Sequence, residues 1–379
     1  MIRRYLLPRP LHPFSWWGWA ILLAVAASST SNPLLIIGII AVACLVVFAR
    51  RADTPWAKAF KLYLWLGLFI VILRVAFRIV FGGGDGATVL FTLPHIPLPS
   101  WVQGIRLLGP VSLEAILTGL YDGLRLAAII ICVGAANALA NPKKLLASLP
   151  GALYELGTVM VVAVSALPQL AESAQRVVRV RRLRRSPEAR TRRQRLRVVE
   201  TIIVPVLSDA LERSLSLAAS MDVRGYGRSG TGSSRDRLLA LGLGLAAMSL
   251  IAVWAYRFLS KARDFYLLGF PMASTALLLV GLAAAAAALW ISGRTVQRTQ
   301  YRPIRWRLAE SLVIGSGLAT TVVLTLIAQY GDASALFPSI QPFTWPELSL
   351  PMLLVLVLAA LPAFLTPLPA LVTPRRLAA

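Results

Sequence analysis

The sequence has few of the residues on which most soluble catalytic sites depend. Its 379 residues include two cysteines, Cys44 and Cys132, and two histidines, His12 and His95. Each cysteine lies inside an apolar run, so the sequence supports neither a disulfide framework nor a cysteine-based metal site. The isolated histidines likewise do not predict a metal centre.

A nucleotide-binding loop is also missing from the sequence. The glycine-rich stretch 82–86 lacks both the lysine and the strand-to-helix setting of a phosphate loop. Ser, His and Asp are not arranged as in a hydrolase elbow. We therefore expect this chain to bind no cofactor, to hold no catalytic residue and not to hydrolyse ATP by itself.

Acidic residues are scarce in a chain that is otherwise very apolar. There are 16 Asp and Glu against 39 Lys and Arg, giving a formal charge of +23, yet 57% of residues are hydrophobic and the mean hydropathy is +0.71. That apolar content exceeds what one soluble core would bury. A charge at the bilayer centre costs roughly 2.5–3.5 kcal/mol. The basic residues must therefore lie in loops or at interfaces.

The apolar runs predict an all-α, polytopic membrane protein. A span needs roughly 20 apolar residues, and eight candidates occur: 15–30, 33–49, 62–81, 115–140, 237–259, 267–292, 308–330 and 350–372. The first two are short and are separated by Ser31-Asn32-Pro33, where proline breaks the helix. They are expected to form either a tight pair of spans or a re-entrant hairpin.

The N-terminus has some features of a secretory signal. Basic residues precede the first apolar run, and Ala24-Val25-Ala26 fits a cleavage site. A second apolar run follows at once, with no hydrophilic mature domain. This order favours an uncleaved membrane hairpin.

Loop charges predict the orientation of the chain. The connections at 50–61 and 293–307 are rich in Lys and Arg and are expected to be cytoplasmic. Those at 82–114 and 331–349 contain a single basic residue, Arg106, and are expected to face outward. Alternation through eight spans places both termini on the cytoplasmic side.

A ninth apolar stretch, 152–170, is long enough to span on hydropathy alone. Lys143 and Lys144 precede it and an arginine cluster follows, so a crossing would leave one strongly basic flank outside. We expect it to lie in the interface or under the bundle. The chain then divides into N-terminal membrane helices (1–140), a cytoplasmic region (141–236) and C-terminal membrane helices (237–379).

The cytoplasmic region contains the sharpest charge anomaly of the sequence. Between positions 176 and 197 there are eleven arginines and a single acidic residue, Glu188. Ser186-Pro187-Glu188 is typical of a helix start. Two long helices are therefore expected to meet near this tripeptide.

The second of these helices is expected over about 188–224. Apolar residues recur along it at three- and four-residue spacing, which indicates one face packed on protein or on the membrane surface. It ends in Met221-Asp222-Val223-Arg224-Gly225-Tyr226-Gly227, where glycine can supply a left-handed cap. Arg224 is expected at an exposed helix end.

Two interpretations of the arginine cluster stay open, and they can apply to different arginines. One is attraction to anionic membrane lipid, and the other is docking to a protein partner with an acidic groove. Nucleic-acid binding is not expected, because no aromatic residues interleave the cluster for base stacking.

The sequence resembles the transmembrane T component of energy-coupling-factor vitamin and metal transporters, in its longer actinobacterial-like form. The resemblance rests on the stretch 135–146 (AANALANPKKLL), on the long cytoplasmic helices and on two Ala-Arg-Gly-type helix ends. One is clear as Val223-Arg224-Gly225. The other is degenerate, because Leu183-Arg184-Arg185 retains arginine but neither alanine nor glycine. The resemblance covers roughly residues 10–260.

The resemblance implies a coupling subunit that works with other chains. In that family the arginines at the two helix ends, here Arg184 and Arg224, dock into two ABC-type ATPases that bind ATP and Mg²⁺. Val223 and Gly225 flank the second docking arginine, with Asp222, Tyr226 and Gly227 as its supporting context. A small membrane S component captures the substrate. The substrate itself and the role of the last three spans are not implied.

Two other function classes were weighed. A self-contained secondary transporter or channel should place charges along a pathway, whereas spans five to eight are almost free of charge. Asp122, Arg125, Arg74 and Arg78, near the outer ends of spans three and four, are better explained by an ion pair or by snorkelling. An integral-membrane enzyme should show clustered His, Asp or Glu.

Overall fold

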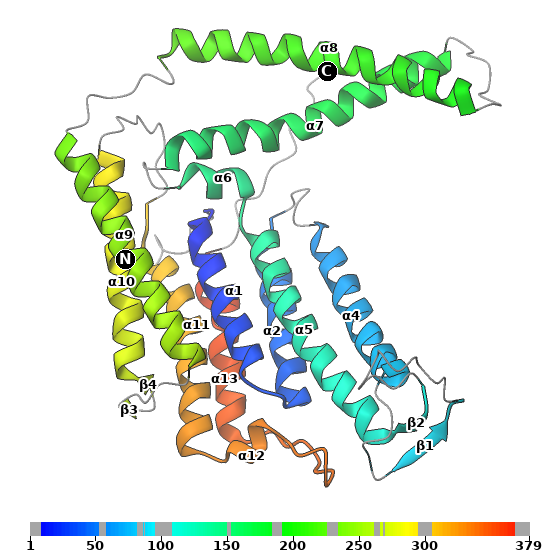
Figure 1. Cartoon of the computed structure of the whole chain (residues 1–379), viewed down its shortest axis with the longest axis vertical. Helices are drawn as coiled ribbons and strands as arrows, with labels where there is room; N and C mark the ends of the chain where they lie inside the picture. The colour runs from blue at the N-terminus through cyan, green and yellow to red at the C-terminus, as the bar shows by residue number, and fades with distance from the viewer. Residues whose placement is uncertain are drawn as a thin grey trace. The chain divides into compact units, whose positions relative to one another are not determined.

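The structure is a computed structural model, which describes residues 9–52, 58–81, 86, 88–94, 108–149, 153–183, 192–225, 234–260, 266–267, 270–294 and 305–367. Its helices are α1 (Pro13–Ser28), α2 (Pro33–Arg50), α4 (Phe60–Phe81), α5 (Leu113–Leu139), α6 (Pro142–Ala147), α7 (Tyr154–Leu183), α8 (Arg192–Val223), α9 (Ser234–Leu259), α10 (Met272–Arg294), α11 (Leu308–Tyr330), α12 (Ala333–Leu336), α13 (Leu350–Ala360) and α14 (Pro362–Leu365) (Figure 1). Two small antiparallel hairpins pair β1 (Val89–Thr92) with β2 (Pro110–Ser112) and β3 (Tyr266–Leu267) with β4 (Phe270–Pro271). The prediction of an all-α membrane protein is confirmed.

The apolar helices agree with most of the predicted spans. Among the described residues, seven helical segments are long and apolar enough to cross a membrane: Pro33–Arg50, Phe60–Phe81, Leu113–Leu139, Leu156–Val180, Ser234–Arg257, Thr275–Gly293 and Leu308–Tyr330. The first and last predicted spans are the shorter apolar helices Pro13–Ser28 and Leu350–Leu365. The segment Leu156–Val180 within α7 is also long and apolar enough to cross a membrane, as its hydropathy alone had indicated. Its placement in the interface stays a prediction.

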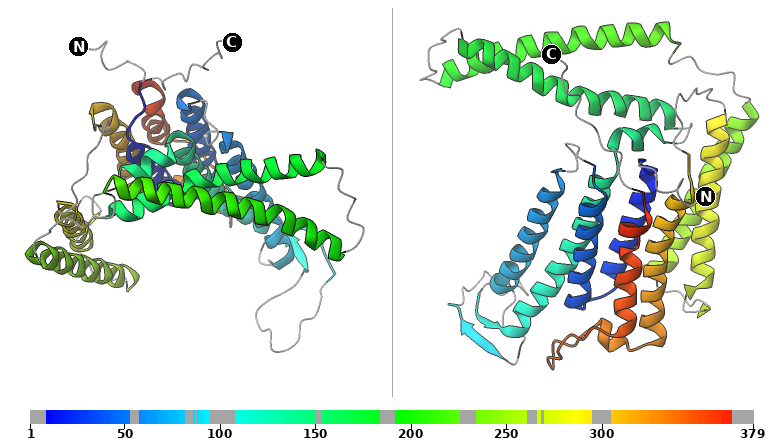
Figure 2. Two further views of the ribbon diagram at one scale, coloured as in Figure 1. Left: turned by 90° about the horizontal axis from the view of Figure 1, so that it is seen from above. Right: turned by 180° about the vertical axis from the view of Figure 1, so that it is seen from behind.

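Contacts between helices divide the chain into two units. In the first unit α1 packs on α5 and α11, α2 packs on α5 and α13, and α11 packs on α13. These contacts close a ring of helices in which α11 and α13 lie beside the N-terminal helices (Figure 2). Helix α4 packs on the outside of α5. The last two predicted spans, which contain α11 and α13, therefore pack with the N-terminal membrane helices predicted over residues 1–140.

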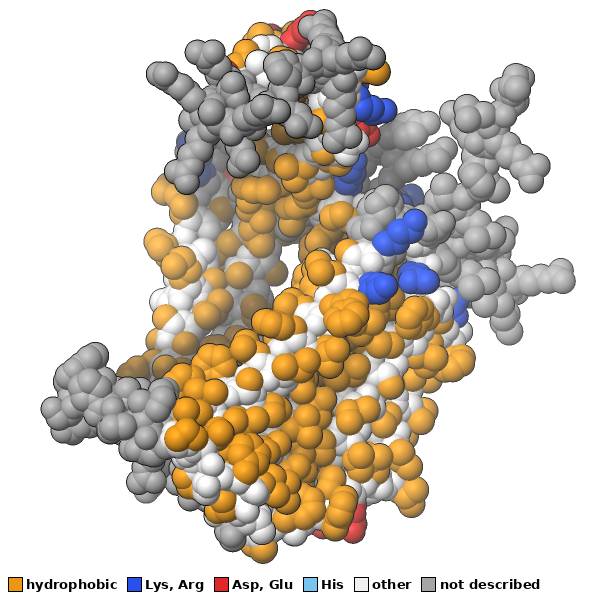
Figure 3. Space-filling view, turned by 90° about the vertical axis from the view of Figure 1, so that its right-hand side faces the viewer, with side chains coloured by type: hydrophobic (Ala, Val, Ile, Leu, Met, Phe, Trp, Pro, Cys, Tyr) orange, Lys and Arg blue, Asp and Glu red, His pale blue; other side chains and the backbone are white. Residues whose placement is uncertain are grey.

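The core of the first unit explains why the ring closes. Most of its largest fully buried side chains come from α1, α2, α11 and α13, among them Trp19, Leu23, Ile36, Leu324 and Met352. The indole nitrogen of Trp19 donates a hydrogen bond to the carbonyl of Ala359 at 3.2 Å, so the one polar atom of this large side chain is paired. Hydrophobic side chains also cover most of the face of the first unit that Figure 3 presents, which is the side where α4 lies in Figure 1. Helices apolar on all sides are typical of a membrane bundle.

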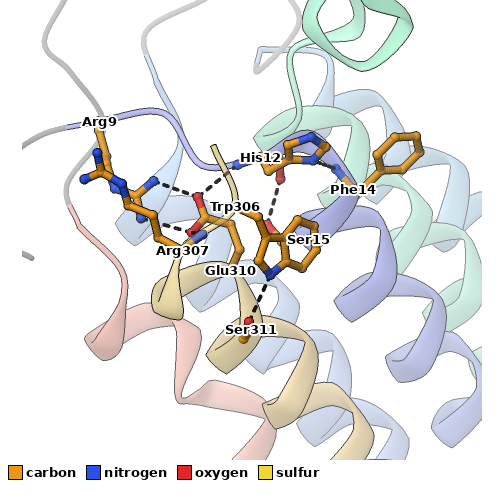
Figure 4. Close-up of polar contacts among 8 residues, drawn as sticks. All are labelled: Arg9, His12, Phe14, Ser15, Trp306, Arg307, Glu310 and Ser311. Atoms are coloured by element: carbon orange, nitrogen blue, oxygen red, sulfur yellow. Dashed lines mark hydrogen bonds and ion pairs between the residues drawn. The ribbon is translucent and has the colours of Figure 1, made fainter. Parts of the chain in front are cut away.

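Charged contacts tie several helix termini together at one end of the first unit. Arg9 donates to both carboxylate oxygens of Glu310, at 2.7 and 3.0 Å, and the Glu310 side chain is fully buried (Figure 4). Glu310 also accepts from the backbone N–H of Arg307 at 3.1 Å. Arg50 donates to the carbonyl of Ala363 at 2.9 and 2.6 Å. The residues before α1 and α11 and those at the ends of α2 and α14 therefore share one end.

Uncharged contacts hold the opposite end. Thr30 donates to the carbonyl of Leu336 at 2.8 Å, and the Asn32 side-chain amide donates to the carbonyls of Ala335 and Glu347 at 2.8 and 2.9 Å. A cavity of about 280 Å³ there is lined by Ser112, Glu114, Ala115, Thr118, Ile340 and Gln341. The loops expected to face outward therefore meet at the end away from Arg9 and Arg50, as alternation requires.

The first two apolar runs form two separate helices, and only α2 is by itself long enough to cross a membrane. Whether the pair spans or forms a re-entrant hairpin stays a prediction. Asn32 caps α2 by accepting from the backbone N–H groups of Leu34 and Leu35, with Pro33 at the first helical position. The helices contain 16 and 18 residues, which corresponds to about 24 and 27 Å of rise. Each packs mainly on other helices of the ring.

The second unit contains two helix pairs. Helices α9 and α10 pack on each other, and α7 packs on α8. Helix α7 continues through Pro168 and α8 through Pro205 without interruption.

Because Glu310 is buried with Arg9, removing the carboxylate should destabilise the first unit. Breaking a buried ion pair from one side costs roughly 3–5 kcal/mol, and the low end applies because the Arg9 side chain is 20% exposed. We expect Glu310→Ala to lower the thermal unfolding midpoint in detergent by several degrees. Glu347→Ala, which removes an exposed carboxylate, is the control. Equal midpoints for the two variants would contradict the stabilising role.

Candidate functional site

The end of α8 has the geometry that the sequence predicted. Gly225 has a φ of +74° and its N–H donates to the carbonyl of Asp222 at 2.9 Å. A positive φ is favourable for glycine, which lacks the Cβ that would clash. The turn stops the helix after Val223, and Val223 and Arg224 are both exposed. The predicted position of Arg224 at an exposed helix end is confirmed.

Other predicted site residues lie outside the described residues. These are Arg184, Tyr226 and Gly227, together with the helix-start signal Ser186-Pro187-Glu188. Among the described residues, α7 extends to Leu183 and α8 begins at Arg192. Leu183, next to the expected docking arginine, is 83% exposed.

Helices α7 and α8 run in opposite directions, so their C-terminal ends lie at opposite ends of the pair (Figure 1). Ser173 and Asp209 mark the place where they touch. From these residues to Leu183 and Val223 the helices rise about 15 and 21 Å. The two ends are therefore up to roughly 36 Å apart and point in opposite directions. Such spacing suits two separate partner chains.

One hydrogen-bonded group joins the two helices. The hydroxyl of buried Ser173 on α7 donates to Asp209 on α8 at 2.7 Å, and Arg213 donates to the same carboxylate at 3.0 Å. These hydrogen bonds, that from Ser173 first, hold the pKa of the Asp209 carboxyl below its usual value. A carboxyl with a lowered pKa stabilises the fold at neutral pH and loses that effect only as the pH falls through the lowered pKa.

Sequence reasoning missed this group. The sequence patterns single out neither Ser173 nor Asp209. No local pattern gives the pairing, because the partners are 36 positions apart on different helices.

The apolar stripe of α8 is uncovered over much of its length within this chain. Ile203, Leu207, Leu211 and Leu215 are 54–71% exposed. A contiguous apolar stripe on a helix that does not span is typical of a surface that binds protein or membrane. This stripe therefore offers a surface to a protein partner or to the membrane, the two kinds of partner left open for this region.

The remaining candidate residues have structural positions. His12 caps α1 by accepting from the backbone N–H of Phe14 at 3.3 Å, and burial lowers its pKa despite the nearby Glu310. His95 lies outside the described residues. The described part of the chain contains no group of three His, Cys, Asp or Glu arranged to hold a metal. Arg78 and Asp122 lie 3.8 Å apart, as expected for a loose ion pair.

Hydrogen bonding across the helix pair gives a test of its geometry. Ser173→Ala removes about 1 kcal/mol of interaction. The angle between α7 and α8 should then vary more. We expect the distance distribution between spin labels at exposed positions 156 and 223, measured by double electron–electron resonance after replacement of the native cysteines, to broaden.

Ser214→Ala is the matched control for this experiment. The Ser214 hydroxyl is exposed and donates only within its own helix, to the carbonyl of Leu211 at 2.8 Å. If Ser173→Ala and Ser214→Ala give the same distribution as the parent chain, the contact does not set the angle.

Comparison with known protein families gives one match. The family CbiQ, described as cobalt transport protein, matches residues 12–233, which is more than half of the chain. The matched region runs from the cap of α1 through α8 and includes Arg184 and the segment 222–227. Helices α9–α14 lie beyond it. No curated protein matches the chain.

Proposed function

The chain belongs to the CbiQ cobalt transport protein family, and we propose that it is the membrane coupling subunit of an ATP-driven importer. Two ABC-type ATPase subunits would hydrolyse ATP on the cytoplasmic side. A small membrane S component would capture the substrate. This chain would hold no catalytic residue, and its helices would transmit motion between the other subunits.

The observation that carries the proposal is the exposed end of α8. Arg224 stands beside a left-handed glycine at the end of a 32-residue helix. A guanidinium group forms planar, bidentate hydrogen bonds with carboxylates, so it can act as a directional clamp in an acidic groove. A stiff helix behind the clamp would carry any movement of its partner along its length.

The antiparallel arrangement of α7 and α8 supports two points of attachment. The end of α7, beside Arg184, and the end of α8, at Arg224, point away from each other. Closure of two ATPases on ATP would push or pull both ends at once. Since the helices touch at Ser173 and Asp209, a movement of the ends would change the angle between them.

We propose a metal ion or a vitamin as the imported substrate. The family description names cobalt, and substrate choice would belong to the S component. The same account places the chain in the bacterial plasma membrane with both termini in the cytoplasm, because the Arg9 and Arg50 end of the first unit carries the basic loops. A self-contained secondary transporter is the alternative.

Arg224→Glu should abolish docking of one ATPase, because it places a carboxylate against an acidic groove. We expect recovery of that ATPase with the tagged chain to fall at least about tenfold, the change given by 1.4 kcal/mol. Lys61→Glu, a charge reversal at an exposed position at the start of α4 in the first unit, is the matched control. Equal recovery with both variants would rule out Arg224 as a clamp.

Sidedness can be measured on whole cells in a chain without native cysteines. Asp332→Cys, in an exposed turn at the Thr30 end, should react with an impermeant maleimide, and Lys61→Cys should react only after lysis. The reverse pattern would invert the proposed topology. Ion-driven transport by the purified chain alone in liposomes would establish the alternative function.

A further inference from the structure

Two arginines lie on the membrane helix α4, where it packs on α5. Arg74 and Arg78 are one turn apart and both are exposed, with the Arg78 side chain 46% exposed. They precede the helix end at Phe81 by seven and three residues, or about 10 and 5 Å of rise. This is the end of α4 that leads to the β1–β2 hairpin. Both arginines are therefore expected at the depth of the outer lipid headgroups and the adjoining hydrocarbon.

Glycines on α5 make room for the stems of these arginines. A Cβ at Gly119 would lie 2.9 Å from Cγ of Arg78, and one at Gly123 would lie 3.0 Å from Cα of Val71 and 3.3 Å from Cβ of Arg74. A larger residue at either position would force the helices apart or displace a stem. The seam between α4 and α5 thus accommodates two arginines at a depth where charge is costly.

The charge in this seam is not balanced within the chain. Asp122 is the acidic partner of Arg78, at 3.8 Å and 39% exposed. Arg74 makes no ion pair or hydrogen bond with any described residue. Arg125 lies one turn beyond Asp122, and its buried Nε has no hydrogen-bond partner within the described part of the chain. Positive charge therefore exceeds negative charge here, which favours an external anion.

We propose that Arg74 and Arg78 bind the phosphate of an outer-leaflet phospholipid. Guanidinium groups bind phosphate bidentately, and a lipid phosphate reaches this depth without the cost of burying a free anion. Phe77 and Phe81, 53% and 46% exposed, flank Arg78 on α4 and offer a surface for an acyl chain. The net positive charge favours an anionic lipid such as phosphatidylglycerol over a zwitterionic one.

This inference does not depend on the coupling function, because it needs only that α4 spans the membrane with its Phe81 end at the outer face. The test is native mass spectrometry of the chain released from nanodiscs that contain equal amounts of phosphatidylglycerol and phosphatidylcholine. We expect the parent chain to retain phosphatidylglycerol preferentially. The double variant Arg74→Gln/Arg78→Gln should retain roughly 25-fold less, since each of the two basic residues contributes about one factor of five.

Lys61→Gln is the matched control, because Lys61 is exposed at the other end of α4. It should retain the lipid like the parent chain. An unchanged thermal unfolding midpoint of the double variant would exclude misfolding as the cause of lipid loss. A large excess of inorganic phosphate should not displace the lipid, because phosphate lacks acyl chains.

Three results would overturn the proposal. Equal lipid retention by the parent and the double variant would show that these arginines do not hold the lipid. Complete displacement by inorganic phosphate would identify a free anion as the ligand. Unchanged lipid retention with loss of a co-purifying membrane protein would identify a carboxylate of that protein as the partner.

Discussion

The exclusion of charge from hydrocarbon is the constraint on which the rest of this structure depends. A chain with 39 basic residues and 57% hydrophobic residues can enter a bilayer only if nearly all of its charge stays at the ends of helices. The first unit obeys this rule at both ends. Arg9 and Arg50 bind a buried carboxylate and a backbone carbonyl at one end, whereas Thr30 and Asn32 use uncharged hydrogen bonds at the other. Helix pairing and loop charge thus point to the same topology.

The same constraint predicts that the basic segment between α6 and α9 lies outside the spans. Its two long helices touch through Ser173 and Asp209 and end far apart, one of them at the exposed Arg224. In the proposed importer this arrangement would convert a change in the separation of two ATPases into a change in a helix crossing angle. The apolar stripe of α8 would contact the neighbouring protein or membrane surface as the crossing angle changes. Arg224 would keep the end of α8 attached to its ATPase during that movement.

Local patterns in the sequence were enough to predict the spans and the end of α8. Apolar run length depends only on neighbouring residues, and so does the left-handed glycine after Arg224. Which distant helices pack on each other could not be predicted from the sequence, because α1 could have packed on any of several helices. The pair of Arg9 and Glu310 joins residues 301 positions apart, and it brings helices beyond the family match into the N-terminal bundle. For the same reason, no sequence pattern predicted that the final helices complete the ring around α1 and α2.

The most direct test of the coupling account is the distance between the two docking ends in the assembled transporter. Spin labels at positions 180 and 220, exposed and about one turn before Arg184 and Arg224, would report it in a chain without native cysteines. The account predicts that the distance changes by several ångströms when the ATPases bind a non-hydrolysable ATP analogue, and that it reverts when the analogue is removed. An identical distance distribution with and without nucleotide, in a complex that still hydrolyses ATP, would contradict it.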